Sequence, residues 1–330
     1  MKSKIILWGP LHGQNTHSYI YWALERAFEK LGQEVHWFSD QSHPSSADFD
    51  YSNSVFIVDN QGLTDRNCPV RDDCIYFSYD EFKDNKYLGR VKSLINFRVA
   101  EYKQVFKDDE RYFEIEKGVM FDTQSPEPYD VIHLAWATNI LPEEIDIDDV
   151  NNKRHNEYNF VGTVHCPRPN APPLHQDFIE IVKNNGIEFN HYDPQKGKTE
   201  ENENIRLMQR SIFVPDFRPQ EQKDNWYVPC RVMKAISYGC LTVSDAPYLQ
   251  DFIDGSLLVS EDAQEIFDLG MANKDNKELI LHQMEVVKRD HTYINRCKGL
   301  LKIVEKINDC LLYTSPSPRD GATSRMPSSA

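Results

Sequence analysis

The stretch Asn225–Asp245 constrains the fold of this chain more than any other. A helix is predicted to begin just after Pro229, because proline is tolerated at a helix start, and to end at Gly239, where glycine suits a left-handed cap. The apolar run Cys240–Val243 that follows predicts a buried strand. Helix, glycine cap and strand together form one half of an α/β crossover unit. If the loop before the helix faces a cleft, Arg231 and the free N–H groups of the first turn predict an anion site, with phosphate as the natural ligand.

The beginning of the chain predicts a second α/β unit. An apolar strand at residues 4–9 runs into a loop, and a helix with apolar residues at helical spacing then ends at Gly32. The next strand is predicted at Glu34–Phe38. The order strand, glycine loop, helix, strand is typical of a doubly wound α/β domain. The loop lacks the second and third glycines of a dinucleotide fingerprint, which disfavours a nicotinamide cofactor.

Similar units are predicted along the rest of the chain. Residues 139–157 are polar, acidic and poor in apolar periodicity, so they are the predicted linker. Other strands are predicted at 54–59, 74–78, 131–134, 158–161, 187–191 and 212–214. Other helices are predicted around 90–107 and at 174–185, 201–210, 276–290 and 292–309.

Charge and cysteine content exclude several classes of protein. The net charge is −15, which argues against a nucleic-acid partner and gives no attraction to an anionic membrane. No apolar run approaches the ~20 residues of a membrane-spanning helix. Seven scattered cysteines, without paired CxxC spacing, favour neither a disulfide framework nor a zinc site. A cytoplasmic protein is therefore expected.

Four segments in the second half carry a resemblance to a known family. In order and spacing they resemble the C-terminal domain of GT-B glycosyltransferases, most closely the spore-maturation-protein-like group, over about residues 158–308. The segments are Pro229–Gly239 with the strand after it, Leu257–Ser260, Ala263–Phe267 and His291–Arg296. The resemblance implies an α/β fold of two Rossmann-like doubly wound domains that face an interdomain cleft.

This resemblance, together with the linker, predicts the domain organisation. Residues 1–138 are the acceptor-side domain, 139–157 the linker and 158–290 the nucleotide-sugar-binding domain, while 291–310 form a helix that crosses back to the first domain. The tail 311–330 is rich in Ser and Pro, and we expect it to be disordered and not native to the protein.

The function that the resemblance implies is transfer of a sugar from a nucleotide-sugar donor to a carbohydrate or other hydroxyl-bearing acceptor. No tightly bound cofactor is expected. No metal is expected either, because no Asp-X-Asp string follows a predicted strand as in metal-dependent glycosyltransferases; Asp146 to Asp148 has that pattern but lies in the linker. Two alternatives stay open: a noncatalytic nucleotide-sugar or carbohydrate-binding relative, and a nucleotide-sugar epimerase of the same fold. Donor base, sugar, acceptor, stereochemical outcome and oligomeric state are not predicted.

The donor site is predicted around the helix after Pro229. A departing nucleotide diphosphate needs positive charge or helix N-termini at its phosphates, and Arg231 is the first candidate, with Lys234 one turn further along. Relatives usually have a glutamate at the position of Lys234, where it binds the donor ribose, and an acidic residue at the position of Trp226. These two departures put ribose recognition in doubt and are also compatible with an inactive relative.

The remaining candidates lie in loops after predicted strands. From the resemblance, Gly162 and Thr163 belong to the glycine loop beneath the donor. Phe217 and Arg218 follow a strand whose exit commonly flanks the base in relatives, and Asp245, at another strand exit, is a candidate contact of the donor sugar. Two histidines in strand-exit loops are candidate bases for the acceptor hydroxyl, His12 and His165. Each of these residues also has an ordinary structural explanation as a turn, core or loop residue.

Overall fold

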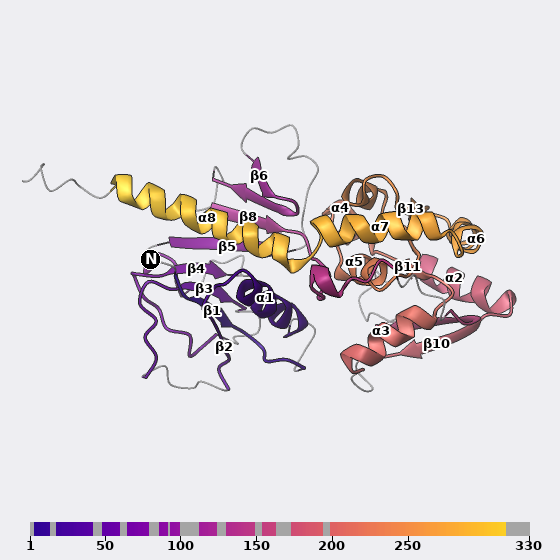
Figure 1. The fold of residues 1–330 in the computed structure, drawn as a ribbon, viewed down its shortest axis with the longest axis horizontal. Helices are drawn as coiled ribbons and strands as arrows, with labels where there is room; N and C mark the ends of the chain where they lie inside the picture. Colours follow the sequence, from indigo (N-terminus) through magenta and orange to yellow (C-terminus); the bar gives the residue numbers. More distant parts are fainter. Residues whose placement is uncertain are drawn as a thin grey trace, which may run out of the picture.

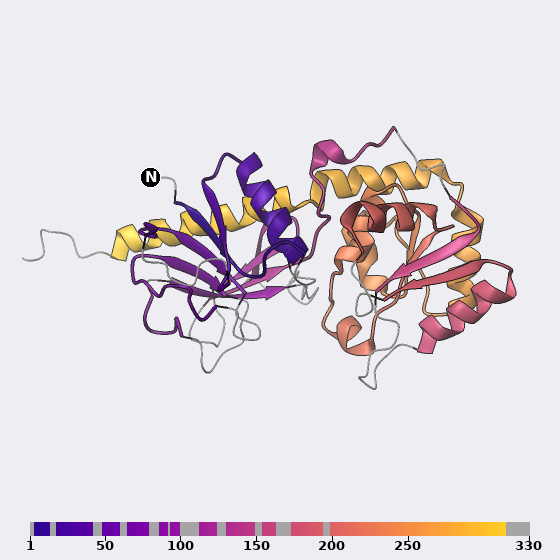
Figure 2. The same cartoon turned by 90° about the horizontal axis from the view of Figure 1, so that it is seen from below.

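The structure is a computed structural model. It describes residues 3–13, 18–41, 48–59, 65–78, 86–91, 93–99, 112–123, 130–148, 154–162, 173–193 and 199–314. The predicted fold class is confirmed: the protein is mixed α/β, with one large, mainly parallel sheet followed by two smaller parallel sheets. Figures 1 and 2 show two lobes side by side, the first built from the large sheet and the second from the two smaller ones.

The large sheet has the strand order β2-β1-β3-β4-β5-β8-β7-β6. Its strands are β1 (Ile5–Trp8), β2 (Val35–Phe38), β3 (Val55–Val58), β4 (Ile75–Ser78), β5 (Ser93–Val99), β6 (Tyr112–Glu116), β7 (Val119–Asp122) and β8 (Asp130–Leu134). Only the pairs β6–β7 and β7–β8 are antiparallel. The order of the first five strands reverses between β1 and β3, and ligands of open α/β sheets bind at such a switch point, outside the carboxyl ends of the strands.

Both faces of this sheet are buried. Along β1, Ile5 and Leu7 contact the helices α1 (Ser18–Lys30) and α8 (Tyr293–Thr314) on one face. Ile6 and Trp8 alternate with them and contact an aromatic cluster on the other face. A parallel strand that is buried on both sides needs a continuous apolar sequence, and this explains why β1, β3 and β4 could be predicted.

The helix predicted around residues 90–107 is wrong, at least in its first part. Residues 93–99 form strand β5, which pairs in parallel with β4 on one side and β8 on the other. The apolar residues of Ser93–Val99 fit either structure in isolation, and pairing between two strands decides in favour of a strand. Residues 100–107 lie outside the described residues.

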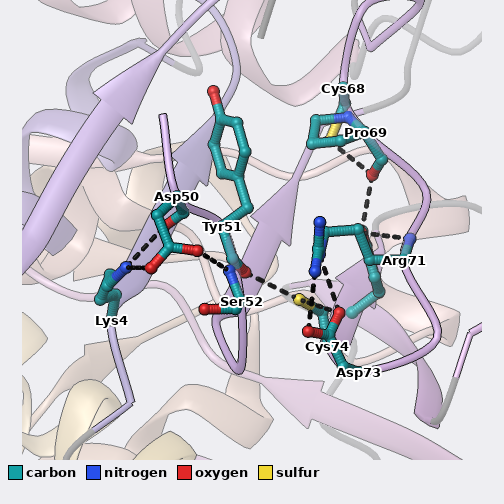
Figure 3. A network of polar contacts seen from close by, with 10 residues as sticks. Lys4, Asp50, Tyr51, Ser52, Cys68, Pro69, Arg71, Asp73 and Cys74 are labelled. Carbon is teal, nitrogen blue, oxygen red and sulfur yellow. Dashed lines mark hydrogen bonds and ion pairs between the residues drawn. The ribbon is translucent and has the colours of Figure 1, made fainter. Parts of the chain in front are cut away.

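A polar network joins the amino ends of three parallel strands, opposite the switch point (Figure 3). Lys4, before β1, forms an ion pair of 3.0 Å with Asp50, and Arg71 forms one of 2.8 Å with Asp73, before β4. The Cys74 thiol donates to Tyr51 O at 3.0 Å, and burial raises its pKa to about 11. These contacts fix the loops at the amino ends of β1, β3 and β4.

The second lobe repeats the strand order of the first. Its sheets are β10-β9 and β11-β12-β13, all parallel. Ile212 N, just before β11, donates to Glu157 O of β9 at 2.9 Å, so the two sheets meet along β9 and β11. Across this junction the order is β10-β9-β11-β12-β13, with a switch point between β9 and β11. The strands are β9 (Glu157–Val161), β10 (Glu188–Tyr192), β11 (Val214–Asp216), β12 (Thr242–Ser244) and β13 (Leu258–Val259).

Most predicted elements of this lobe are confirmed, with small shifts at their ends. Strands β11 and β12 each begin two residues later than predicted. The helices are α2 (Pro173–Asn184), α3 (Glu201–Arg210), α4 (Gln220–Asp224), α5 (Cys230–Ser237), α6 (Ala263–Asn273) and α7 (Lys277–Asp290), with 3-10 helices η3 (Pro142–Glu144) and η4 (Pro247–Ile253).

The predicted linker is partly packed against both lobes. Arg26 of α1 forms an ion pair of 2.5 Å with Glu144, while Ile145 is buried in the core of the second lobe. Residues 149–153 lie outside the described residues, and Glu157 already belongs to β9. The division of the chain into two separately folding domains near residues 139–157 therefore stays a prediction.

Helix α8 lies along the first lobe, whereas α7, which precedes it, lies on the second (Figure 1). It packs on α1 in one apolar cluster through residues such as Cys297 and Leu300. The helix continues to Thr314, so the first four residues of the predicted disordered tail are helical, and the remainder lies outside the described residues. In the described part of the chain no helix is both long and apolar enough to span a membrane.

Candidate functional site

Arg231 lies at the switch point of the second lobe. Helix α5 begins at Cys230, as the proline before it predicted, and this places Arg231 in the first turn. Its guanidinium donates to Val161 O at the end of β9 (2.9 Å) and lies 4.4 Å from the centre of the Phe160 ring. Among the described residues it has no carboxylate partner in an ion pair. Burial, and next the charge of Arg218, lower the pKa of Arg231 below its ordinary value.

The absence of a side chain at Gly162 leaves room for the Arg231 guanidinium. Its φ of +153° disfavours other residues, and a Cβ atom at this position would lie 2.7 Å from Arg231 Nη2. His191, at the end of β10, lies with Nε2 2.7 Å from Gly162 O. The Gly162 turn is thus held by two basic side chains. The sequence prediction missed His191, although the predicted strand 187–191 ended at it.

A cluster of aromatic rings packs against Phe160, which precedes the same turn. The His175 ring lies 4.6 Å from Phe160 and is stacked on Phe217 at 4.7 Å. Burial lowers the pKa of His175 to about 3, so this ring is neutral at physiological pH. Phe217 also packs on Phe178, 5.2 Å away. We call Phe160, Gly162, His175, His191 and Arg231 the Arg231 cluster.

Arg218 and Asp245 lie beside this cluster but are engaged with other residues. Both carboxylate oxygens of Asp216 accept from the Arg218 guanidinium, one of them at 2.8 Å. Asp245 Oδ1 accepts from the backbone N of Arg218 at 2.9 Å, and Oδ2 lies 3.5 Å from Lys223 Nζ. The predicted contacts of Arg218 with the base and of Asp245 with the sugar therefore compete with these internal partners, and both stay predictions.

The Asp245 carboxyl is expected to make stability fall as pH rises. Burial first, and then the charge of Asp216, raise its pKa from 3.8 to about 6. The folded protein therefore holds this proton more tightly than the unfolded chain, and the resulting stabilisation is complete below about pH 4 and lost as pH rises through about 6. A shift of about two pKa units corresponds to about 3 kcal/mol.

The measurement is urea unfolding of the wild type and Asp245→Asn at pH 4 and pH 7. The wild type is expected to lose about 2 kcal/mol of unfolding free energy between pH 4 and pH 7 relative to the variant, because part of the titration lies below pH 4. Other titrating groups cancel in this difference. Parallel pH profiles for the two proteins would contradict a raised pKa at Asp245.

Lys234 lies away from the Arg231 cluster, at the boundary between the lobes. Its Nζ is 3.6 Å from Glu201 Oε1 of α3 and 5.3 Å from the centre of the Tyr19 ring of α1. The same Glu201 oxygen accepts from Tyr238 Oη at 3.2 Å. With Tyr19, Trp136 and residues of both lobes, Lys234 lines a cavity of about 130 Å³. Among the described residues, Lys234 and Arg231 therefore share no contact partner, and a role for Lys234 at phosphates stays a prediction.

His12 lies on the first lobe near the same boundary. Its exposed ring stacks on Trp22 at 5.1 Å and meets the edge of Tyr19 at 5.3 Å. Tyr19 in turn contacts Lys234 of the second lobe, so His12 is one aromatic ring away from it. The other predicted base, His165, and the predicted donor-loop residue Thr163 lie outside the described residues.

Trp226 occupies a position where the resemblance to GT-B glycosyltransferases implies an acidic residue, as Lys234 does. Its backbone is left-handed, with φ of 53°, and its ring lies 5.0 Å from Tyr248. In the described segments no group of three or more His, Cys, Asp or Glu side chains is arranged to hold a metal ion. A metal-independent reaction stays a proposal.

No family model matches the sequence, and no curated protein matches it either. Among solved structures, the chain is similar to T4 phage BGT, determined in complex with its UDP-glucose substrate. The two share 12% sequence identity, with a TM-score of 0.47 over 92% of this chain and 98% of that chain.

Proposed function

We propose that the protein is a glycosyltransferase that moves a sugar from a nucleotide-sugar donor to a hydroxyl-bearing acceptor. The observation that carries the proposal is Arg231. It is a partly buried cation at the carboxyl ends of β9 and β11, its partners are a carbonyl oxygen and an aromatic ring, and no carboxylate of the described residues is in ion-pair contact with it. Asp216, the nearby carboxylate, is paired with Arg218, so the burial cost of Arg231 is lowered further when an anionic ligand binds, and a diphosphate supplies that charge.

The fold around Arg231 supports a diphosphate in particular. Val161 and Gly162 close the strand at the switch point, where ligands of such sheets bind. Since Gly162 has no Cβ, the Arg231 guanidinium can lie against the backbone at the end of β9, where it could meet a phosphate. His191 adds a second nitrogen at the same turn, 2.7 Å from Gly162 O. The resemblance of Pro229–Gly239 to GT-B glycosyltransferases agrees with this placement.

His12 is our proposed base for the acceptor hydroxyl. It belongs to the loop after β1, at the switch point of the first lobe, and contacts Tyr19 at the boundary between the lobes. An acceptor bound there would lie between His12 and the second lobe. Replacing His12 by Gln is expected to reduce transfer by about 10²-fold or more while leaving donor affinity unchanged.

A noncatalytic nucleotide-sugar-binding protein is the second candidate, and Lys234 favours it. Where the family pattern has a ribose-binding glutamate, this lysine is buried and paired with Glu201. A nucleotide could still bind through Arg231, whereas ribose recognition would need another residue. Donor binding without transfer to any acceptor is the result that this candidate requires.

The proposal is tested by thermal-shift screening against UDP-, GDP-, ADP- and CMP-sugars. One nucleotide class is expected to raise the melting temperature, because a ligand at 100 times its Kd adds about 2.7 kcal/mol of stability. The stabilising nucleotide sugar is then incubated with a mixture of acceptors, and released nucleotide is measured with and without them. Acceptor-dependent release supports the transferase, binding without release supports the noncatalytic candidate, and no binding to any of the four rejects both.

A further inference from the structure

A cavity of about 460 Å³ lies in the second lobe at the amino ends of β9 and β11. Arg154 lines it just before β9 and Ile212 just before β11. Lys274 lines it from the turn after α6, and Lys277 from the first residue of α7. The five residues of β9 separate this cavity from the Arg231 cluster, a distance of about 16 Å at the usual rise of a strand. Substrates of open α/β sheets bind at the carboxyl ends, so this cavity is not part of the proposed donor site.

The charge of the cavity lining is opposite to that of the protein. The chain has a net charge of −15, but the lining holds three cations, Arg154, Lys274 and Lys277, and one carboxylate, Asp275. Ile212 adds a buried apolar floor. In an acidic protein this concentration of positive charge selects for a small anion that can enter the cavity.

Asp275 is the internal partner of two of these cations. Arg154 Nη1 lies 3.6 Å from Asp275 Oδ1, which is longer than a hydrogen bond, and Lys274 pairs with Oδ2. The Arg154 side chain is only 15% exposed and is therefore held by the fold, whereas that of Asp275 is 76% exposed at the rim. Lys277, also exposed, has no ion-pair partner within the described segments. An exposed carboxylate in loose contact is easily displaced, because exposed ion pairs contribute little.

We propose that this cavity binds a small phosphate-bearing anion, separately from the donor, and that Asp275 competes with that anion for Arg154 and Lys274. Arg154 adds the positive charge of its largely buried guanidinium to the wall of the cavity. The ammonium groups of Lys274 and Lys277 supply point charges on the side of the cavity formed by the α6–α7 turn. The carboxylate of Asp275 turns outward to solvent when the anion is bound.

The test is calorimetric titration of pyrophosphate at low salt into the full chain carrying Arg231→Ala, so that the donor site does not contribute. Pyrophosphate is expected to bind in this background. Adding Lys277→Gln removes one cation and is expected to weaken binding about threefold to tenfold. Adding Asp275→Asn removes the competing carboxylate and is expected to tighten binding by a similar factor.

Lys298→Gln is the matched control, because Lys298 is exposed on α8 and the substitution removes the same charge. It is expected to leave pyrophosphate affinity unchanged. Absence of binding in the Arg231→Ala background would overturn the proposal. Equal weakening by Lys277→Gln and Lys298→Gln, or weaker binding to Asp275→Asn, would also overturn it, since either shows that the local arrangement is not what holds the anion.

Discussion

Arg296→Met is expected to lower the free energy of unfolding by about 3–5 kcal/mol, because several carbonyl groups lose their hydrogen-bond donor at once. Arg296 is fully buried, and its guanidinium donates to Ala135 O at 2.7 Å, Lys117 O at 2.6 Å and Trp136 O at 3.1 Å. It also donates to Asp290 O at 3.0 Å. Without the guanidinium these carbonyl groups are left buried and unpaired, and each costs about 1–3 kcal/mol unless water replaces it.

The neighbours of Arg296 add to the expected loss. His291 Nδ1 lies 3.1 Å from Arg296 Nη2, and its Nε2 lies 2.5 Å from Phe252 O. Burial, and next the charge of Arg296, lower the pKa of His291, so that this ring is a neutral acceptor toward the arginine. Gly118, with φ of 76°, leaves room for the guanidinium in the turn between β6 and β7. One side chain therefore holds the start of α8 to the first lobe and to the end of α7.

Urea unfolding and calorimetric melting measure this effect. Lys298→Met is the control, because it places the same residue on the exposed side of the same helix and is expected to change stability by about 0.5 kcal/mol or less. Arg296→Lys keeps the charge but not the fork, and is expected to fall between wild type and Arg296→Met. A loss for Arg296→Met no larger than that of the control would show that α8 is held by its apolar contacts alone.

Arg231→Ala is expected to weaken nucleotide binding by about 10- to 150-fold. The guanidinium supplies a charge-assisted contact to the donor phosphates worth about 1.5–3 kcal/mol, and about 1.4 kcal/mol is tenfold in affinity. Arg231→Lys is expected to recover only part of the loss, because a point charge does not reproduce two parallel hydrogen bonds. Folding is expected to change by less than about 1 kcal/mol, since the lost bond to Val161 O is offset by the removal of a buried charge.

Calorimetric titration of the nucleotide sugar that passes the stability screen tests this prediction. Arg206→Ala is the matched control: Arg206 is exposed on α3, its ion pair with Glu203 is local, and its loss is expected to leave affinity unchanged. If a well-folded Arg231→Ala protein bound the nucleotide sugar with unchanged affinity, Arg231 would be an ordinary helix residue without a role in binding. That result would contradict the proposed donor site. It would not bear on the anion site at Arg154, which the pyrophosphate titration tests independently.

The sequence by itself determined the elements whose signals are local. The strands β1, β3 and β4 are continuous apolar runs, and α5 begins after Pro229 and ends before Gly239. Those signals depend on residues within one or two turns of each other, so they can be read without knowing what packs against them. The same holds for Arg231, because its place in the first turn of α5 follows from the start of that helix.

Only the tertiary structure decided which partner each side chain has. Residues 93–99 became a strand because β4 and β8 lie on either side, and a short apolar run does not distinguish strand from helix. Lys234 meets Glu201, 33 positions before it, and Arg296 meets carbonyl groups about 160 positions before it. The first pair is fixed by the packing of α3 beside α5, and the second by the packing of α8 on the first lobe. Contacts between elements that are distant in the sequence follow no fixed spacing, so the sequence pattern does not predict them.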